Sequence, residues 1–298
     1  MARKQVKSVA GMVVAITGGA RGIGKCTAQS LIRRGARVAI GDLHAELAEE
    51  TAAELGGNCV AFELDVTDRE SFSRFLDSAE SELGPIDVVI NNAGIMPIGP
   101  FIEETDETAK TMIDINLHGV IYGTKLALER MLPRGSGHIV NIASQAGKAG
   151  LPGGATYCAT KHAVVGLSEA VRLENIDKGI EVSCVMPAVV NPELGSGLVD
   201  TRGVKKLEPE EVAEAIVEAI ETNRFDVWVP RSSAGIAAIL SLVPRSGREA
   251  IARILKADKV LAEADEQERA DYEDRAAKST SEAGAGSGAD AEQPATKG

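Results

Sequence analysis

Short apolar segments alternate along this chain with longer amphipathic ones. The short segments are rich in β-branched residues, and we expect strands at 12–17, 37–42, 58–63, 88–91, 138–143, 181–185 and 226–229. Between them, apolar residues recur at helical spacing and predict helices over 23–34, 45–55, 68–83, 105–131, 156–178 and 208–222. This alternation predicts an α/β fold: a doubly wound parallel sheet of about seven strands with helices on both faces.

The pattern changes towards the carboxyl end. No repeat or linker divides residues 1–230, so we assign 1–245 to a single domain. Residues 246–277 are predicted to form a charged helical extension. The last segment, 278–298, consists mostly of small, polar and acidic residues with little to bury, and this composition predicts a disordered acidic tail.

Composition narrows the possible partners. The 298 residues are 44% hydrophobic, enough for a sizeable core, while the net charge is -12 and aromatic residues make up only 3%. Nucleic acid is therefore not expected as a partner, because it selects for basic patches and stacking rings. The cysteines Cys26, Cys59, Cys158 and Cys184 are widely separated, so neither a metal site nor a disulfide framework is expected.

Two apolar stretches bear on location. The run 9–16 follows a basic start but leads into a glycine-rich turn rather than a cleavage site, so we interpret it as a buried strand of a cytoplasmic protein. The run 234–243 is shorter than the about 20 residues that a transmembrane helix needs. The arginine-containing stretch 236–255 fits either a membrane surface or a subunit interface, and the net charge favours the interface.

A glycine-rich turn connects the first predicted strand to the first helix, in the sequence TGGARGIG at 17–24. Gly18, Gly22 and Gly24 permit a tight turn, close approach of backbone to a pyrophosphate, and close packing of helix on strand. Taken alone, such a turn is as often a plain structural turn as a binding site. Its position after a strand favours a dinucleotide site.

Asp42 ends the second predicted strand, where an acid can bind the adenine-ribose hydroxyls of NAD. The less favoured alternative is that Asp42 caps the following helix, a common role of Asp. Arg21, in the glycine loop, favours the 2′-phosphate of NADP instead. That phosphate would lie beside Asp42, and one pair of like charges at about 4 Å costs roughly 4 kcal/mol at an effective dielectric of about 20, before screening. We therefore expect NAD, with NADP less favoured.

Two further strand ends carry candidate cofactor contacts. Asp65 and Val66 follow the third strand, where the acid suits either the adenine amino group or a helix cap. Asn92, Ala93 and Gly94 follow the fourth, where small residues let the chain pass close to a cofactor or simply turn.

The segment YCATK at 157–161 indicates proton transfer. Within a helix, Tyr157 and Lys161 stand at i and i+4 on one face, so the ammonium can lie beneath the phenol. We expect this cation to lower the phenol pKa from about 10, allowing Tyr157 to act as a general base. Ser144, upstream of this segment, adds a hydroxyl to the same proton-transfer group.

Together these motifs resemble those of the short-chain dehydrogenase/reductase family over residues 10–230. TGGARGIG, Asp42, Asp65, NNAG at 91–94, Asn116, Ser144 and YCATK occur in the family's order and approximate spacing. The resemblance implies a single Rossmann-fold domain that binds NAD(P) and substrate in one cleft.

The resemblance also implies roles for individual residues. Tyr157 is the acid/base that accompanies hydride transfer, Lys161 lowers its pKa and holds the nicotinamide ribose, Ser144 binds the reacting oxygen, and Asn116 anchors a relay water. Cofactor contacts from Ile23, Pro187 and Val190 are implied as well.

The chain departs from the family pattern after the sixth strand. Ala188 replaces a glycine and Pro192 replaces a threonine, which removes a hydroxyl and an amide N–H near the nicotinamide carboxamide. An alternative reading is therefore a nucleotide-sensing or interaction protein with a weakened nicotinamide site. A third keeps the fold but performs epimerisation or dehydration.

Apolar residues follow the fourth strand at 95–98 and Phe101, and the loop 191–207 carries few acids. They predict a lipophilic secondary alcohol or ketone as substrate, steroid- or retinoid-sized at the widest, although ordinary core packing explains them equally. Relatives commonly assemble through helices that correspond to 105–131 and 156–178, so the resemblance implies a homodimer or homotetramer.

Overall fold

Seven parallel strands form one sheet at the centre of the molecule in a computed structural model that describes residues 6–190, 207–254 and 261. The strand order is β3-β2-β1-β4-β5-β6-β7. The strands are β1 (Val13–Thr17), β2 (Arg37–Asp42), β3 (Cys59–Glu63), β4 (Val88–Asn91), β5 (Gly137–Ile142), β6 (Ile180–Pro187) and β7 (Asp226–Val229). The predicted doubly wound sheet is therefore confirmed.

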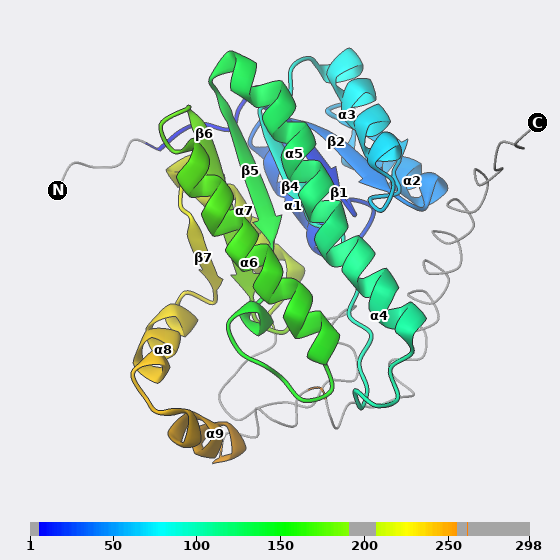
Figure 1. Ribbon diagram of the computed structural model, residues 1–298. Coiled ribbons are helices and arrows are strands. Elements are labelled where there is room, and N and C mark those ends of the chain that lie inside the picture. The colour runs from blue at the N-terminus through cyan, green and yellow to red at the C-terminus, as the bar shows by residue number, and fades with distance from the viewer. Residues whose placement is uncertain (1–5, 191–206, 255–260, 262–298) are drawn as a thin grey trace, which may run out of the picture.

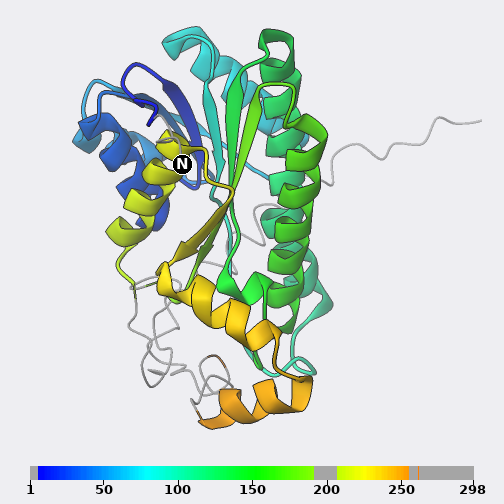
Figure 2. The same ribbon diagram turned by 90° about the vertical axis from the view of Figure 1, so that its left-hand side faces the viewer.

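The α-helices cover both faces of the sheet (Figures 1 and 2). One face packs against α1 (Gly22–Arg33), α2 (Ala45–Leu55) and α7 (Pro209–Thr222). The other packs against α3 (Arg69–Leu83), α5 (Gly119–Met131) and α6 (Ala155–Asn175). β1 is buried throughout, as expected of a strand covered on both sides.

The predicted helix over 105–131 is interrupted. It consists of α4 (Asp106–Ile113), the π-helical turn η1 (Asp114–His118) and α5. Short 3₁₀ turns occur at η2 (Leu132–Arg134) and η3 (Gln145–Gly147). Hydrophobic spacing does not reveal a π-turn, because it displaces the apolar face only slightly.

Two helices follow β7 that the strand-and-helix pattern did not predict separately. They are α8 (Ser232–Ser241) and α9 (Arg245–Ile254), and they extend from the body beside β7 (Figure 1). None of the residues of α8 is buried. Of the predicted segments, the tail 278–298 and most of the extension 246–277 lie outside the described residues, so this division of the chain stays a prediction.

The parallel arrangement positions the site. The strand order runs outwards in opposite directions from β1 and β4, and the carboxyl ends of two such neighbouring strands are where doubly wound folds bind their ligands. The predicted glycine loop follows β1 and the NNAG segment follows β4. Among the described helices, none has both the length and the apolar character required to cross a bilayer.

Candidate active site

The glycine loop between β1 and α1 adopts a conformation that depends on its glycines. Gly18 and Gly22 have φ values of 63° and 51°, in the left-handed region that L-residues rarely adopt. A Cβ on Gly18 would lie 2.9 Å from the Cα of Ala93, and one on Gly24 would overlap the carbonyl oxygen of Gly18. Side chains at these positions would therefore push the loop open.

The first turn of α1 fits a phosphate group. Its N-cap residue, Arg21, makes no side-chain cap hydrogen bond, whereas the N-cap of α3, Asp68, accepts from two backbone amides. The amides at the start of α1 are therefore not taken by a capping side chain, and the helix dipole favours an anion there. Ile23, in the same turn, packs partly buried against the core. This geometry fits the pyrophosphate of a dinucleotide.

The segment after β4 lies directly against this loop. Asn92 Nδ2 donates to the carbonyl oxygens of Thr17, at 2.9 Å, and Gly18, at 3.0 Å. In return, Thr17 Oγ1 accepts from the amides of Asn92 and Ala93, both at 3.0 Å. The structure thus brings together two predicted cofactor-binding segments that are far apart in the sequence.

Asp42 supports the glycine loop from the end of β2. Its Oδ2 accepts from the Ala20 amide at 3.2 Å, and its Oδ1 accepts from the amide of His44, the residue that precedes α2, at 3.3 Å. Asp42 therefore does not cap α2, whose N-cap residue is His44 and has no side-chain cap hydrogen bond. Each carboxylate oxygen can accept more than one hydrogen bond, so these contacts are compatible with binding a ribose hydroxyl.

Asp65 forms a turn rather than a helix cap. Its Oδ1 accepts from the Thr67 amide at 2.8 Å and from the Thr67 hydroxyl at 2.7 Å, while Asp68 caps α3. Val66 is 8% exposed and packs against Gly119 of α5. Both residues lie at the carboxyl edge of the sheet, after β3.

Tyr157 and Ser144 meet beside the end of β5. Tyr157 lies in the first turn of α6, is 8% exposed, and is hydrogen-bonded to the Ser144 side chain. Ser144 starts η3, where its Oγ accepts from the Ala146 amide at 3.1 Å and lies 3.5 Å from the carbonyl oxygen of Pro187 in β6. Three separate elements therefore converge on the Ser144 hydroxyl.

Lys161 and Asn116 approach the same position from two helices. Lys161 Nζ lies 5.7 Å from the centre of the Tyr157 ring and donates to the Ile142 carbonyl oxygen at 2.9 Å. Asn116, in η1, is fully buried, and its side chain exchanges two 2.8 Å hydrogen bonds with the Ile95 backbone. A Cβ on Gly94 would lie 3.1 Å from Asn116 Oδ1 and 3.6 Å from Lys161 Nζ.

The electrostatics of this pair differ from the prediction. Burial raises the pKa of Tyr157 to about 12, and the Ser144 hydrogen bond opposes that shift without reversing it. Burial also lowers the pKa of Lys161 to about 8. The expected lowering of the Tyr157 pKa by Lys161 is therefore wrong for this structure, because withdrawal from water favours the neutral form of both groups.

Apolar side chains surround Tyr157. The cluster contains Met96, Met112, Ala146, Tyr157, Cys158 and Leu261, with Ile95, Ile98, Leu151 and Val189 packed against it. The sequence pointed to 95–98 but not to Met112 or Leu261, which belong to no motif. Val190 pairs with Leu207, and the residues between them, including Pro192 and most of the predicted substrate loop, lie outside the described residues.

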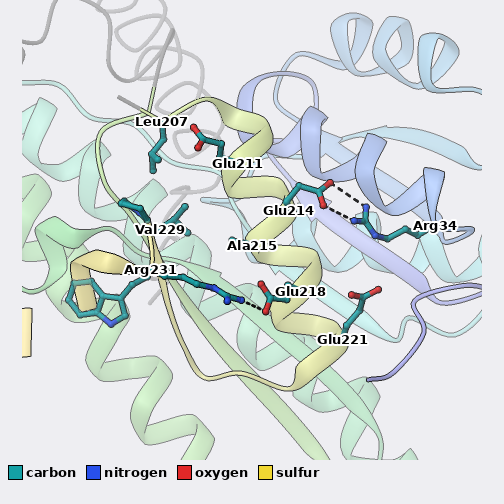
Figure 3. A pocket seen from close by; sticks show the side chains of 11 residues that line it. Arg34, Leu207, Glu211, Glu214, Ala215, Glu218, Glu221, Val229 and Arg231 are labelled. Atoms are coloured by element: carbon teal, nitrogen blue, oxygen red, sulfur yellow. Dashed lines mark hydrogen bonds and ion pairs between the residues drawn. The ribbon is translucent and has the colours of Figure 1, made fainter. Parts of the chain in front are cut away.

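An acidic hollow lies elsewhere, along α7 (Figure 3). It has a volume of about 430 Å³, and Arg34 and Arg231 form ion pairs with Glu214 and Glu218 along it. None of the predicted catalytic residues lines this hollow. We therefore assign the candidate active site to the strand ends at β1, β4 and β5.

Comparison with known proteins identifies the family. The family model described as short chain dehydrogenase matches residues 12–203. The chain therefore belongs to the short-chain dehydrogenase/reductase family, the Rossmann-fold oxidoreductases that its motifs resemble.

Relatives within the family have different named substrates. A sorbitol dehydrogenase of Cereibacter sphaeroides is 40% identical over 63% of this chain and 74% of that protein. The 17-beta-hydroxysteroid dehydrogenase 13 of Rattus norvegicus is 36% identical over 75% of this chain and 76% of that protein. A family member from Burkholderia phymatum, solved in complex with NAD, has a TM-score of 0.70 and 26% identity, covering 78% of this chain and 93% of that chain. These relatives support an enzyme that acts on CH–OH groups with a nicotinamide cofactor.

Proposed function

We propose that this protein is an NAD(H)-dependent dehydrogenase or reductase that interconverts a lipophilic secondary alcohol and its ketone, with Tyr157 as acid/base. The observation that carries the proposal is the position of Ser144 next to Tyr157, whose ring lies in an apolar cluster. This places one proton-transferring group among side chains that suit an apolar substrate. The sensor interpretation has no use for such a pair.

Each side chain of the proposed site has its own role in alcohol oxidation. Ser144 donates a hydrogen bond to the substrate oxygen and holds it near Tyr157. Tyr157, as phenolate, removes the hydroxyl proton, and in the reverse direction the phenol returns it. The bound nicotinamide supplies the acceptor or donor of the hydride. Lys161, whose Nζ lies 5.7 Å from the centre of the Tyr157 ring, holds the nicotinamide ribose, and Asn116 fixes the backbone of Ile95.

The Tyr157 pKa sets a requirement on this mechanism. A phenol with a pKa of about 12 is almost wholly protonated at neutral pH, which suits it to donate a proton during ketone reduction. Oxidation needs the phenolate, and additional positive charge close to the ring favours that form. We therefore expect oxidation to gain more than reduction from raising the pH.

The surroundings of Tyr157 favour a lipophilic substrate over a sugar alcohol. Within the described part of the chain, the cluster around the ring consists of aliphatic, thioether and thiol side chains. Such groups provide no adequate partners for several hydroxyls, and burying an unpaired hydroxyl costs roughly 1–3 kcal/mol. Among the relatives, the steroid dehydrogenase has the more apolar named substrate.

Replacement of Tyr157 by Phe tests the acid/base assignment. We expect kcat for lipophilic secondary alcohols to fall by roughly 100-fold or more while the Kd for NADH changes little, because only the phenolic oxygen is lost. Tyr122→Phe, which alters a tyrosine packed against His118, is the matched control. Turnover of the Tyr157 variant at the wild-type rate would exclude Tyr157 as the base. Wild-type NADH binding with no turnover on a broad panel would instead support the sensor.

The carboxylate of Asp42 supports NAD over NADP in the proposed enzyme. It is fixed at the loop by the Ala20 amide, so a 2′-phosphate would meet a charge that cannot move away easily. We expect Asp42→Asn to raise kcat/KM for NADP relative to NAD by at least about tenfold. Glu63→Gln, on the neighbouring strand, is the control. If the wild-type enzyme prefers NADP, Asp42 does not set the cofactor preference, and Arg21 is assigned to bind the 2′-phosphate instead.

Exposed apolar residues support a homo-oligomer. Leu173 and Ile176, at the end of α6, are 67% and 50% exposed, and Ile239 on α8 is 66% exposed. Sedimentation as a stable monomer at working concentration would contradict this proposal.

A cytoplasmic location is supported by all four cysteines being free, and cell fractionation tests it.

A further inference from the structure

Leu261 lies against the candidate catalytic residue although it is far from every motif. It is 5% exposed and packs in one cluster with Tyr157 and Cys158 of α6, Met96 after β4, and Met112 of α4. The family model ends at residue 203, so it provides no counterpart for this position.

A glycine provides the space that Leu261 occupies. Gly154 is the N-cap of α6, one turn before Tyr157, and a Cβ on it would lie 2.7 Å from Leu261 Cδ1. The φ of Gly154 is -140°, which any L-residue adopts. The absence of a side chain is therefore required by the neighbouring Leu261, not by the backbone conformation.

The other walls of this space are held by backbone contacts. The Gly99 amide donates to the Gly153 carbonyl oxygen at 2.9 Å, which joins the loop after β4 to the loop before α6. The Leu151 amide contacts Cys158 Sγ at 3.3 Å. Leu261 thus packs against Tyr157 beside two loops that are joined to each other and to α6.

We propose that Leu261 is a specificity-determining residue, forming the apolar wall against which one substituent of the substrate's carbinol carbon packs. This inference rests on the proposed function, because it assigns a role at the same site. An isobutyl group cannot hydrogen-bond, so it favours an alkyl or ring substituent and disfavours a hydroxylated one. Its size limits how bulky that substituent can be.

Two variants test the proposal: Leu261→Ala shortens the Leu261 side chain, and Gly154→Ala displaces it. Truncation of Leu261 opens space, whereas a methyl on Gly154 displaces the flexible end of Leu261 with little effect on the fold. The measurement is kcat/KM with NAD for 2-alkanols from 2-butanol to 2-dodecanol and for cyclohexyl carbinols bearing a methyl group. Leu242→Ala, at a position that is 86% exposed, is the control.

We expect Leu261→Ala to raise kcat/KM for the bulky carbinols relative to 2-butanol by at least about tenfold, since a single methylene in an apolar pocket changes specificity roughly 10- to 200-fold. Gly154→Ala should shift the same ratio, while the KM for NAD and the control stay unchanged. An equal gain for all alcohols in Leu261→Ala would mean that Leu261 obstructs the site, and would overturn the proposal. An unchanged ratio in both variants would overturn it as well.

A binding measurement separates this inference from the proposed function. The methyl resonances of Met96 and Met112, recorded on methionine-labelled protein, report binding of the ketone 2-decanone at the cluster. If wild type binds 2-decanone there but never oxidises an alcohol, the proposed function fails. The wall is then supported by a Kd change of at least about tenfold in Leu261→Ala and overturned by an unchanged Kd.

Discussion

His138 makes the stability of this protein depend on pH. The ring is buried in β5, and burial, reinforced by the positive charge of Lys7, lowers its pKa from 6.5 to about 3. Its Nε2 lies 2.8 Å from Ser183 Oγ, and that hydroxyl donates to the Arg224 carbonyl oxygen at 2.6 Å. Because the single hydroxyl proton of Ser183 is used, His138 Nε2 must carry the hydrogen and donate it.

The sign and size of the effect follow from proton linkage. Below pH 6.5 the unfolded chain binds a proton at His138 that the folded protein excludes until about pH 3. The stability contributed by the neutral ring is complete above pH 6.5 and is lost as the pH falls towards 3, at about 1.4 kcal/mol per pH unit. By about pH 4.5 the loss reaches about 3 kcal/mol, a large fraction of a typical folding free energy.

His138→Gln removes the titration and keeps an N–H that can reach Ser183. Urea unfolding, followed by fluorescence of the single tryptophan, Trp228, gives the free energy of unfolding of both proteins from pH 7.5 to 4.5. We expect the wild type to lose about 3 kcal/mol more than the variant across this range, because their other titrating groups are shared. Ser183→Ala should be less stable at every pH yet keep the wild-type pH dependence. If the free energies of unfolding of wild type and His138→Gln fall in parallel from pH 7.5 to 4.5, the reasoning is refuted.

Two further predictions concern the cofactor loop and α7. Gly24→Ala should weaken NADH binding at least about tenfold in a fluorescence titration, because its Cβ would overlap the Gly18 carbonyl; Gly57→Ala, with open space around it, should bind as wild type does. Glu214→Gln should cost about 1 kcal/mol or less of unfolding free energy, since this carboxylate is half exposed and its ion pair with Arg34 is screened. The Arg34 hydrogen bond lowers the pKa of Glu214 from its usual value of 4.5. The stability that the Glu214 carboxylate contributes is therefore present above pH 4.5 and is lost as the pH falls through the lowered pKa. If wild type and Glu214→Gln differ in unfolding free energy by the same amount at pH 7 and pH 3, this reasoning is contradicted.

The order of elements could be predicted because strands and helices leave different periods in the sequence. The predicted β2 and β4 have the bounds found in the structure, since both are short apolar runs ended by a polar residue at the sheet edge. The π-turn around Asn116 could not be predicted, because one extra residue per turn does not remove the helical spacing of apolar positions. α8 was missed for a different reason: it is too short to tell from a buried apolar run.

The candidate site was predicted where chemistry depends on local sequence. The glycine loop and the spacing of Tyr157 and Lys161 belong to single segments, so the sequence carries them. The raised pKa of Tyr157 and the presence of Leu261 depend on which distant segments close over the ring. Burial and long-range packing cannot be read from the local sequence around Tyr157. The predicted lowering of the Tyr157 pKa failed for that reason.

The position of Lys161 depends on a buried polar ladder across the sheet. Asn91 Nδ2 donates to Asn141 Oδ1 at 2.8 Å, and Asn141 Nδ2 donates to Ser168 Oγ at 3.0 Å, joining β4 and β5 to α6. Ser168 lies two turns after Lys161 on the same face of α6. Apolar contacts alone allow a helix to slide along a sheet, whereas displacing these amides would leave them unpaired at about 1–3 kcal/mol each. Asn141 thus fixes α6 on the sheet, and Asn91, which resembled a cofactor-loop residue, supports Asn141 from β4.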